Sequence, residues 1–122
     1  MKVLIVDDEP LAQQRLQQML KEHAQVSEVI LANNGLQAVE STQENKPDVV
    51  LMDIVMPGLN GFQATRQLSK DPSTQHIPVI IVTTKDQETD RVWGKRQGAK
   101  GYLVKPVPTA RLMEEIAMVM AG

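Results

Sequence analysis

Five short apolar runs, separated by segments with helical periodicity, constrain the fold of this chain more than any other feature. They occupy residues 3–6, 29–31, 49–52, 79–82 and 101–104. Runs without charged residues are typical of parallel strands that are buried on both faces. Because crossovers between parallel strands are right-handed, the connecting helices cover both faces of the sheet. The sequence therefore predicts an α/β fold, a doubly wound parallel five-stranded sheet built from five β-α units, (βα)5.

The segments between the runs predict the helices. Apolar residues recur at helical spacing after Pro10, after Gly61 and towards the end of the chain, while a second helix runs to about Asn45. The segment 86–97 is polar and is followed by Gly98, a good C-cap residue. The expected strand order is the flavodoxin-like 2-1-3-4-5. With no linker or repeat, we expect residues 1–122 to form one domain.

Composition and charge exclude several classes of protein. The 122 residues are 42% hydrophobic and 23% charged, with a net charge of −2 and no cysteine. A chain of this kind has a globular core, no electrostatic footprint for nucleic acid and no disulfide framework. No apolar segment approaches the roughly 20 residues of a membrane span, and the first apolar run is too short for a signal peptide. We expect a cytoplasmic protein without nucleic-acid or membrane partners.

The stretch 47–61 contains the first candidate for chemistry. The apolar run 49–52 ends at Asp53, and Pro57, Gly58 and Gly61 then favour turns that leave the sheet. Open α/β sheets bind ligands at the carboxyl ends of their strands, where Asp53 lies. Taken alone, Asp53 can equally be a residue that caps the turn.

Two further carboxylates decide between these readings. Asp7 and Asp8 end the first run, and strands one and three are neighbours in the expected order. Alone, such a pair can be a helix N-cap, but beside Asp53 it forms a cluster of like charges that requires a cation. Oxygen ligands suit Mg²⁺ or Mn²⁺. We expect Asp8 to bind the metal directly, Asp7 directly or through water, and the backbone carbonyl of Val55 to add a ligand.

Thr83 and Lys105 end the fourth and fifth runs, so the same edge gains a hydroxyl and an ammonium group. Alone, Thr83 can be a turn hydroxyl and Lys105 a solvated surface lysine. Together with the carboxylates they suggest phosphoryl transfer, in which Asp53 attacks a phosphoryl group and forms an acyl phosphate. Lys105 and Thr83 would then bind the phosphoryl oxygens.

These motifs, taken together, resemble the receiver domain of two-component response regulators over the whole chain. The matching segments are Val6-Asp7-Asp8, Asp53 with Met56-Pro57-Gly58, Val82-Thr83-Thr84 and Tyr102-Leu103-Val104-Lys105-Pro106. The resemblance implies that Asp53 is the phosphoacceptor, that Asp7 and Asp8 are the acidic metal pair, and that Thr83 and Lys105 are the switch pair. It also implies a cis peptide bond at Pro106, and a Tyr102 ring that moves inward when Thr83 engages the phosphoryl group.

A narrower resemblance covers residues 47–106, which are similar to the stand-alone receiver of the chemotaxis-like system that controls type IV pilus twitching motility. The N-terminal segment KVLIVDDEPLAQQRL is more similar to receivers attached to LytTR-type DNA-binding domains. A divergent relative, a mosaic and an engineered receiver all fit this division of the chain.

The resemblance implies a signalling domain rather than an enzyme, phosphorylated by a histidine kinase and slow to dephosphorylate itself. Its output protein would bind the face formed by residues 86–120, and the domain would be a monomer or a weak homodimer. Trp93 is either half-buried or part of that partner surface, and Tyr102 is either a switch residue or sheet packing. The alternative is a binding module that acts without phosphorylation.

A dinucleotide-binding domain is disfavoured, because acidic residues replace the glycine-rich first turn. A haloacid-dehalogenase-like phosphohydrolase is also disfavoured, because the D-x-D pattern is missing.

Overall fold

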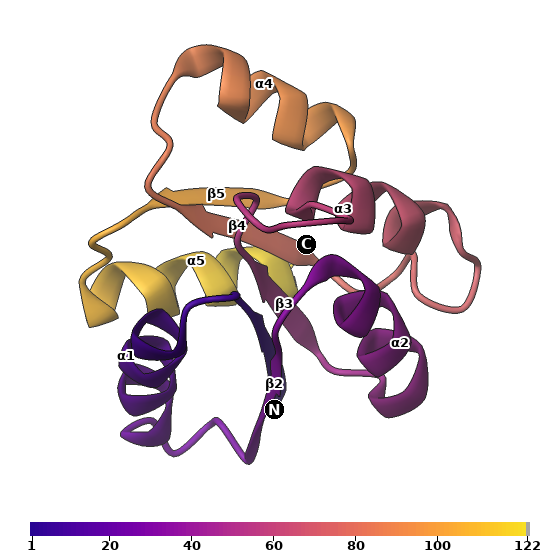
Figure 1. Ribbon diagram of the computed structural model, residues 1–122. Coiled ribbons are helices and arrows are strands. Elements are labelled where there is room, and N and C mark those ends of the chain that lie inside the picture. Colours follow the sequence, from indigo (N-terminus) through magenta and orange to yellow (C-terminus); the bar gives the residue numbers. More distant parts are fainter. Residues whose placement is uncertain (122) are drawn as a thin grey trace.

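Strands and helices alternate along the whole of the described chain. The computed structural model describes residues 1–121 (Figure 1). The strands are β1 (Lys2–Val6), β2 (Glu28–Ala32), β3 (Val49–Met52), β4 (Val79–Thr83) and β5 (Gly101–Val104). The helices are α1 (Pro10–Lys21), α2 (Gly35–Asn45), α3 (Gly61–Lys70), α4 (Glu88–Arg96) and α5 (Thr109–Ala121). The predicted alternation of five strands and five helices is confirmed.

The five strands form one parallel sheet in the order β2-β1-β3-β4-β5. This is the predicted flavodoxin-like order. The chain starts near the middle of the sheet, winds outward to β2, crosses back over β1 to β3 and continues to β5. The order reverses between β1 and β3, which places the carboxyl ends of these two strands side by side.

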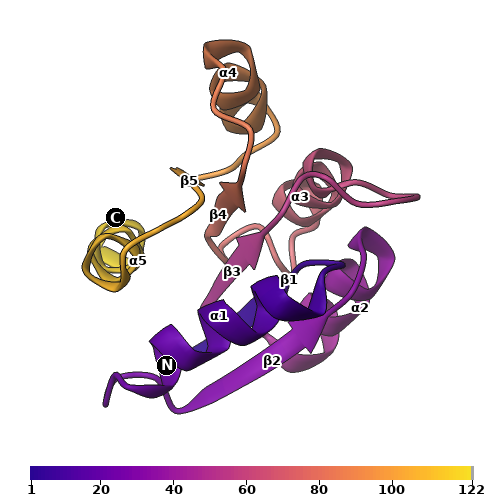
Figure 2. The ribbon, with the colours of Figure 1, turned by 60° about the vertical axis from the view of Figure 1, so that its left-hand side comes forward.

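Two apolar layers, one on each face of the sheet, hold the helices. The helices α1 and α5 cover one face, where Leu16 and Leu112 pack against Ile5 and Ile80 (Figure 2). On the other face, α2 and α3 contribute Ala38 and Leu68. Burial on both faces explains why the strand sequences are continuously apolar rather than alternating.

The helix α4 is held less firmly than its neighbours. Its one buried residue is Gly94, and Val92 and Trp93 are 42% and 48% exposed. A Cβ atom at position 94 would lie 2.7 Å from Cδ1 of Ile81, so the glycine lets the helix approach β4 closely. The views in Figures 1 and 2 show α4 standing at one end of the sheet beside β5. This helix therefore presents most of its surface to solvent.

Element boundaries differ from the predicted ones by one or two residues. β1 begins at Lys2, β2 extends from Glu28 to Ala32, and α4 is shorter than the predicted 86–97. Thr83 lies within β4, because it pairs with Val104 of β5. Within residues 1–121, no helix has the length and apolar character needed to span a membrane.

Candidate functional site

The carboxylates Asp7, Asp8 and Asp53 meet at the switch point of the sheet. The register pairs Val6 with Met52, and the Asp53 amide donates to the carbonyl of Val6 at 2.9 Å, so the two strand ends are fixed side by side. One oxygen from each of the three carboxylates lies within 4.8 Å of the other two. Asp7 is 1% exposed and Asp53 is 9% exposed, whereas Asp8 faces solvent.

Asp7 also stabilises the turn that follows β1. Its Oδ1 atom accepts a hydrogen bond from the amide of Glu9 at 3.0 Å. The turn-capping role and the cluster are therefore compatible, because one carboxylate has two oxygens. The other oxygen, Oδ2, faces Lys105.

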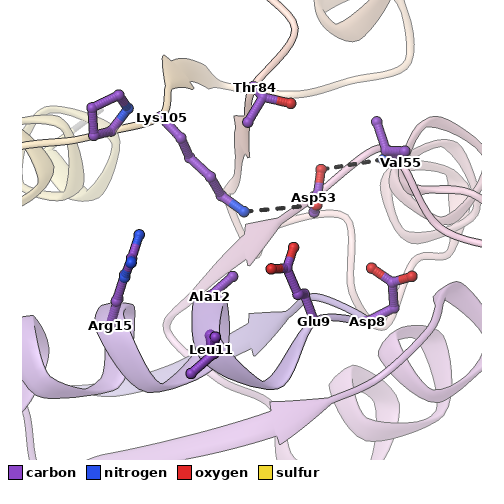
Figure 3. A pocket seen from close by; sticks show the side chains of 10 residues that line it. Asp8, Glu9, Leu11, Ala12, Arg15, Asp53, Val55, Thr84 and Lys105 are labelled. Atoms are coloured by element: carbon purple, nitrogen blue, oxygen red, sulfur yellow. Dashed lines mark hydrogen bonds and ion pairs between the residues drawn. The ribbon is translucent and has the colours of Figure 1, made fainter.

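Lys105 reaches two of the three carboxylates. Its Nζ atom lies 2.6 Å from Oδ2 of Asp7. It lies 3.7 Å from Oδ2 of Asp53, a contact that Figure 3 shows. The backbone around it is fixed by a hydrogen bond from its amide to the Thr83 carbonyl at 2.7 Å, and its peptide bond to Pro106 is cis. The ammonium group thus balances part of the negative charge that β1 and β3 bring together.

Asp53 has a perturbed acidity. Burial raises the pKa of its carboxyl group above the ordinary value of 3.8, and the charge of Asp7 adds to this effect. The Val55 amide, which donates to Oδ1 of Asp53 at 3.2 Å, and the charge of Lys105 lower the pKa and offset the rise in part. The Thr83 hydroxyl also lowers the pKa, by a smaller amount. Asp53 is therefore a desolvated carboxylate whose ionised form is favoured by an amide, a cation and a hydroxyl.

The other predicted site residues lie around this cluster at different depths. Thr83 is fully buried, and its hydroxyl accepts a long hydrogen bond, 3.4 Å, from the Lys85 amide. The Tyr102 hydroxyl donates to the Lys85 carbonyl at 2.9 Å, and its ring lies under the Arg91 guanidinium. Trp93 lies on α4 and does not line the cleft beside Asp53.

The open cleft at the cluster has a volume of about 660 Å³ (Figure 3). Asp8, Asp53, Val55, Lys105 and Pro106 line it, as do residues that the sequence had not singled out for this site: Glu9, Leu11, Ala12, Arg15 and Thr84. In the structure Thr84, not Thr83, is the threonine exposed to the cleft.

Gln13 is a supporting residue that sequence reasoning missed. It is 7% exposed, and its side-chain amide donates to the carbonyl oxygens of Asp7 and Ala32 and to Oδ1 of Asn33. It therefore ties α1 to the ends of β1 and β2. A detectable signal was present: Gln13 precedes Leu16 and Leu20 by three and seven positions, which puts a polar residue on the buried face of the helix.

The chemistry of the donor set suits a hard divalent cation. Every potential ligand in the cluster is an oxygen, and the exposed Asp8 leaves one side open to water. Mg²⁺ keeps several water ligands and takes one or two carboxylates from a protein, which fits this arrangement.

Comparison with known proteins identifies the family. Residues 3–117 match the response regulator receiver domain. The chain belongs to this family. The predicted receiver family, which four motif segments indicated, is therefore confirmed, and the chain is a signalling module of the two-component type rather than a classical enzyme.

Among curated proteins, protein PilH of Pseudomonas aeruginosa is 60% identical over 121 residues, covering 99% of this chain and 98% of that protein. The predicted resemblance to the stand-alone twitching-motility receiver is confirmed, and this relative spans both the N-terminal segment and residues 47–106. The response regulator DivK of Brucella anthropi is 34% identical over 93% of this chain and 91% of its own.

Solved structures agree with this assignment. The chemotaxis protein CheY4 of Vibrio cholerae superposes with a TM-score of 0.88 at 30% identity, over 97% of each chain. The receiver domain of a sensor histidine kinase from Pseudomonas aeruginosa has a TM-score of 0.89 at 30% identity, over 99% of this chain and 98% of that one. That structure holds a magnesium ion coordinated in the active site cleft.

Proposed function

We propose that residues 1–122 act as one phosphoacceptor unit, in which Asp53 receives a phosphoryl group from a histidine kinase. One observation carries the proposal: three carboxylates lie within 4.8 Å of one another, and a single ammonium group, that of Lys105, contacts two of them. Three negative charges this close repel one another, so a fold that keeps them together points to a function in which a cation binds the carboxylates.

The proposed reaction is an in-line transfer. An oxygen of Asp53 attacks the phosphorus of a phosphohistidine, the new O–P bond forms as the N–P bond breaks, and the imidazole nitrogen leaves with the bonding pair and takes up a proton. The product is an acyl phosphate on Asp53. Lys105 then pairs with one phosphoryl oxygen, and Thr83 donates its hydroxyl to another, as the fixed charges of such sites do. Hydrolysis of the acyl phosphate returns the domain slowly to its starting state.

Asp7, Asp8, Asp53 and the backbone carbonyl of Val55 would hold Mg²⁺ or Mn²⁺. When bound, the metal neutralises negative charge on the phosphoryl oxygens. The residues of this chain supply the rest: Lys105 orients the Asp53 carboxylate, and the Val55 amide fixes the carboxylate's other oxygen at 3.2 Å.

We further propose that phosphorylation changes the affinity of the 86–120 face for an output protein. Thr83 and Tyr102 connect Asp53 to this face, since the Thr83 hydroxyl acts on the Asp53 carboxylate and both residues contact Lys85. A phosphoryl group that binds the Thr83 hydroxyl shifts the population towards the conformation in which that contact is made. The similarity to PilH supports a role in type IV pilus control.

Phosphotransfer from an N–P donor tests the proposal. The chain is incubated with phosphoramidate and Mg²⁺ and observed by phosphorus NMR. We expect an acyl phosphate signal in the wild type and in the control Asp86→Asn, which removes an exposed carboxylate outside the cleft, but not in Asp53→Asn. An equal signal in all three chains would contradict the assignment of Asp53.

The pathway is tested separately. A Pseudomonas aeruginosa strain lacking PilH is supplied with this chain or with Asp53→Asn, and twitching zones are measured. We expect the wild type to restore the zones and the variant to fail at equal protein level. Restoration by both chains would favour a binding module that acts without phosphorylation.

A further inference from the structure

The two outer strands of the sheet, β2 and β5, differ in how their free edges are protected. β5 lies between Lys100 and Lys105, and none of its residues is exposed. β2 carries its one charged residue, Glu28, at its start, and Leu31 is 42% exposed. It also pairs with β1 in an unbroken register, without a bulge. Proteins commonly protect an open edge with lysine, proline or a bulge, because such an edge pairs readily with another strand. The β2 edge, residues 28–32, has none of these.

The backbone of β2 offers hydrogen-bonding groups on its outer side. The Asp7 amide donates to the Ala32 carbonyl at 3.1 Å, so the backbone groups of Ala32 point towards β1. The direction of hydrogen bonding alternates along a paired strand, so those of Val29 and Leu31 point away from the sheet. Among residues 1–121, no strand pairs with this side of β2, which Figure 2 shows as the outer edge of the sheet. Two amides and two carbonyls are therefore available to a further strand.

The sequence of β2 suits antiparallel pairing with a copy of itself. About a two-fold axis through Ile30, Val29 of each copy lies opposite Leu31 of the other, and both are hydrogen-bonded pairs. Val29 packs against the layer that α1 and α5 cover, and Leu31 shares its face by alternation, so these apolar side chains meet across the axis. Glu28 lies opposite Ala32 and not opposite a second acid. The paired strands therefore place no like charges opposite each other.

The side of α1 nearest β2 is mostly uncharged. Residues 12, 15 and 19 line a hollow beside Pro106, so helical spacing places Gln14, Gln17 and Lys21 on the opposite side of the helix. The two-fold axis makes the two α1 helices run antiparallel. Lys21, in the last turn, therefore does not face its own copy.

The acids near the β2 edge also stay apart across the axis. Glu22 and Glu28 lie between the end of α1 and the start of β2, and Glu44 lies in the last turn of α2. The Lys2 ammonium ties that last turn to the start of β1, so all three acids lie at the amino end of the strands. In the antiparallel pair this end meets the carboxyl end of the second β2, which continues into residues 33–34, both asparagine. The three acids therefore do not face their own copies.

We propose that the β2 edge binds a second copy of this chain, in antiparallel register about Ile30, so that two sheets join into one. The carboxylate cleft stays open in this assembly, because none of the residues that line it belongs to β2 or to the loop that follows β2. The pairing holds two phosphoacceptor units side by side, and it does not rest on the proposed function.

Cysteine cross-linking tests the register. The chain has no cysteine, so each variant carries a single thiol. Ile30 lies opposite its own copy in a pair without hydrogen bonds, with Cα atoms about 4.5 Å apart, within reach of a disulfide. Leu31 and its copy are offset by about 7 Å along the strands, beyond that reach. With oxidised glutathione as the oxidant, we expect Ile30→Cys to form a disulfide-linked dimer at least about tenfold faster than Leu31→Cys.

Chance collisions favour the opposite order, because Leu31 is exposed and Ile30 is only partly exposed. Equal rates, or faster linkage through Leu31→Cys, would overturn the proposed register.

Sedimentation equilibrium tests the association without a cross-link. Leu31→Lys places an ammonium group against Val29 of the second copy and should weaken the association at least about tenfold. Val92→Lys on α4 is the matched control, because Val92 is also 42% exposed. It should change the association less than about twofold.

Two outcomes of this measurement would count against a second copy at the β2 edge. A larger loss in Val92→Lys than in Leu31→Lys would overturn the proposal in favour of an interface on α4. A wild type that stays monomeric at every concentration would overturn it in favour of an extended segment of another protein.

Asp53→Asn separates this proposal from the proposed function. We expect the wild type and Asp53→Asn to associate with the same dissociation constant, since Asp53 lies in the cleft and not at the β2 edge. A dimer that accepts no phosphoryl group would overturn the proposed function alone. A monomer that accepts one would overturn this interface alone.

Discussion

Asp53 is a buried residue that must be ionised to react, and burial opposes ionisation. It is 9% exposed, and burial raises its pKa, yet the proposed chemistry requires its ionised form. The Lys105 ammonium and the Val55 amide favour that form and keep the carboxylate available. Such a site is expected to lower stability in return for reactivity.

This opposition gives a prediction for pH. The folded-state pKa of Asp53 lies above its ordinary value of 3.8, so ionisation destabilises the fold as pH rises through the folded-state pKa, and the penalty is absent below 3.8. In magnesium-free buffer, Asp53→Asn should therefore raise the free energy of unfolding at pH 7 by about 1 kcal/mol. The gain should shrink as pH falls towards 3.8.

Urea unfolding at a series of pH values measures this effect. The exposed Asp86→Asn serves as the control and should change stability by less than about 0.5 kcal/mol. A loss of stability in Asp53→Asn at pH 7, or a gain of the same size at every pH, would contradict the account of Asp53.

Gln13 yields a second prediction at this scale. Its amide nitrogen lies 2.5 Å from the Asp7 carbonyl oxygen, 3.2 Å from that of Ala32 and 2.8 Å from Oδ1 of Asn33. Gln13→Leu leaves the buried Asp7 carbonyl without this donor, although the Ala32 carbonyl keeps its bond from the Asp7 amide. It should lower the free energy of unfolding by about 2 kcal/mol. Chemical denaturation measures the loss, with Gln14→Leu on the exposed face as control. Similar effects of the two substitutions would show that the hydrogen bonds of Gln13 are not the cause.

At the scale of elements, the junction between β3 and α3 positions the phosphoacceptor. The helix begins with a capping box in which the side chains of Asn60 and Gln63 bond each other's backbone amides. Its first residue, Gly61, packs directly on the backbone of Asp53 and Ile54. The start of α3 thus fixes where the Asp53 main chain lies.

Gly61→Ala tests this packing. An added Cβ would lie 2.1 Å from the carbonyl oxygen of Asp53 and 2.7 Å from Cα of Ile54, and neither backbone atom can move without the loop. The expected loss is about 3 kcal/mol, well above the roughly 1 kcal/mol that alanine gains over glycine in a helix. Thermal unfolding measures it, with the exposed Gln67→Ala of the same helix as control. A neutral or stabilising Gly61→Ala would refute the close approach.

At the scale of the whole molecule, the fold could be predicted because its strands are buried on both faces. Continuous apolar runs such as 49–52 and 79–82 leave few other structures open, and right-handed crossovers reduce the possible strand orders. The convergence of Asp7, Asp8 and Asp53 followed from that order alone. Strand ends were less predictable, since Thr83 joins β4 through pairing with β5, a contact between distant segments.

The finer geometry of the site depends on packing that no local pattern contains. Lys105 lies closer to Asp7 than to Asp53, although 98 positions separate Lys105 from Asp7 in the sequence. Packing of the loops against the sheet likewise decides that Thr84 rather than Thr83 faces the cleft. It also decides which carbonyl groups the Gln13 side chain reaches.

Metal binding gives a prediction for the molecule as a whole. A ligand that binds only the folded state stabilises it, by about 2.7 kcal/mol at a hundredfold excess over its dissociation constant. Mg²⁺ should therefore raise the thermal midpoint of the wild type, and Asp8→Asn should lose most of this increase. Sodium chloride at matched ionic strength is the control. An equal shift in the wild type and Asp8→Asn, or with sodium chloride alone, would show that the carboxylate cluster does not bind the metal.

The most direct test of phosphoacceptor function is intact-mass spectrometry after incubation with acetyl phosphate, with and without Mg²⁺, on the wild type and Asp53→Asn. We expect the wild type to gain one phosphoryl group only when Mg²⁺ is present, and Asp53→Asn to gain none. An adduct on Asp53→Asn, or no adduct on the wild type even with rapid sampling, would contradict the assignment of Asp53 and favour a binding module that acts without phosphorylation.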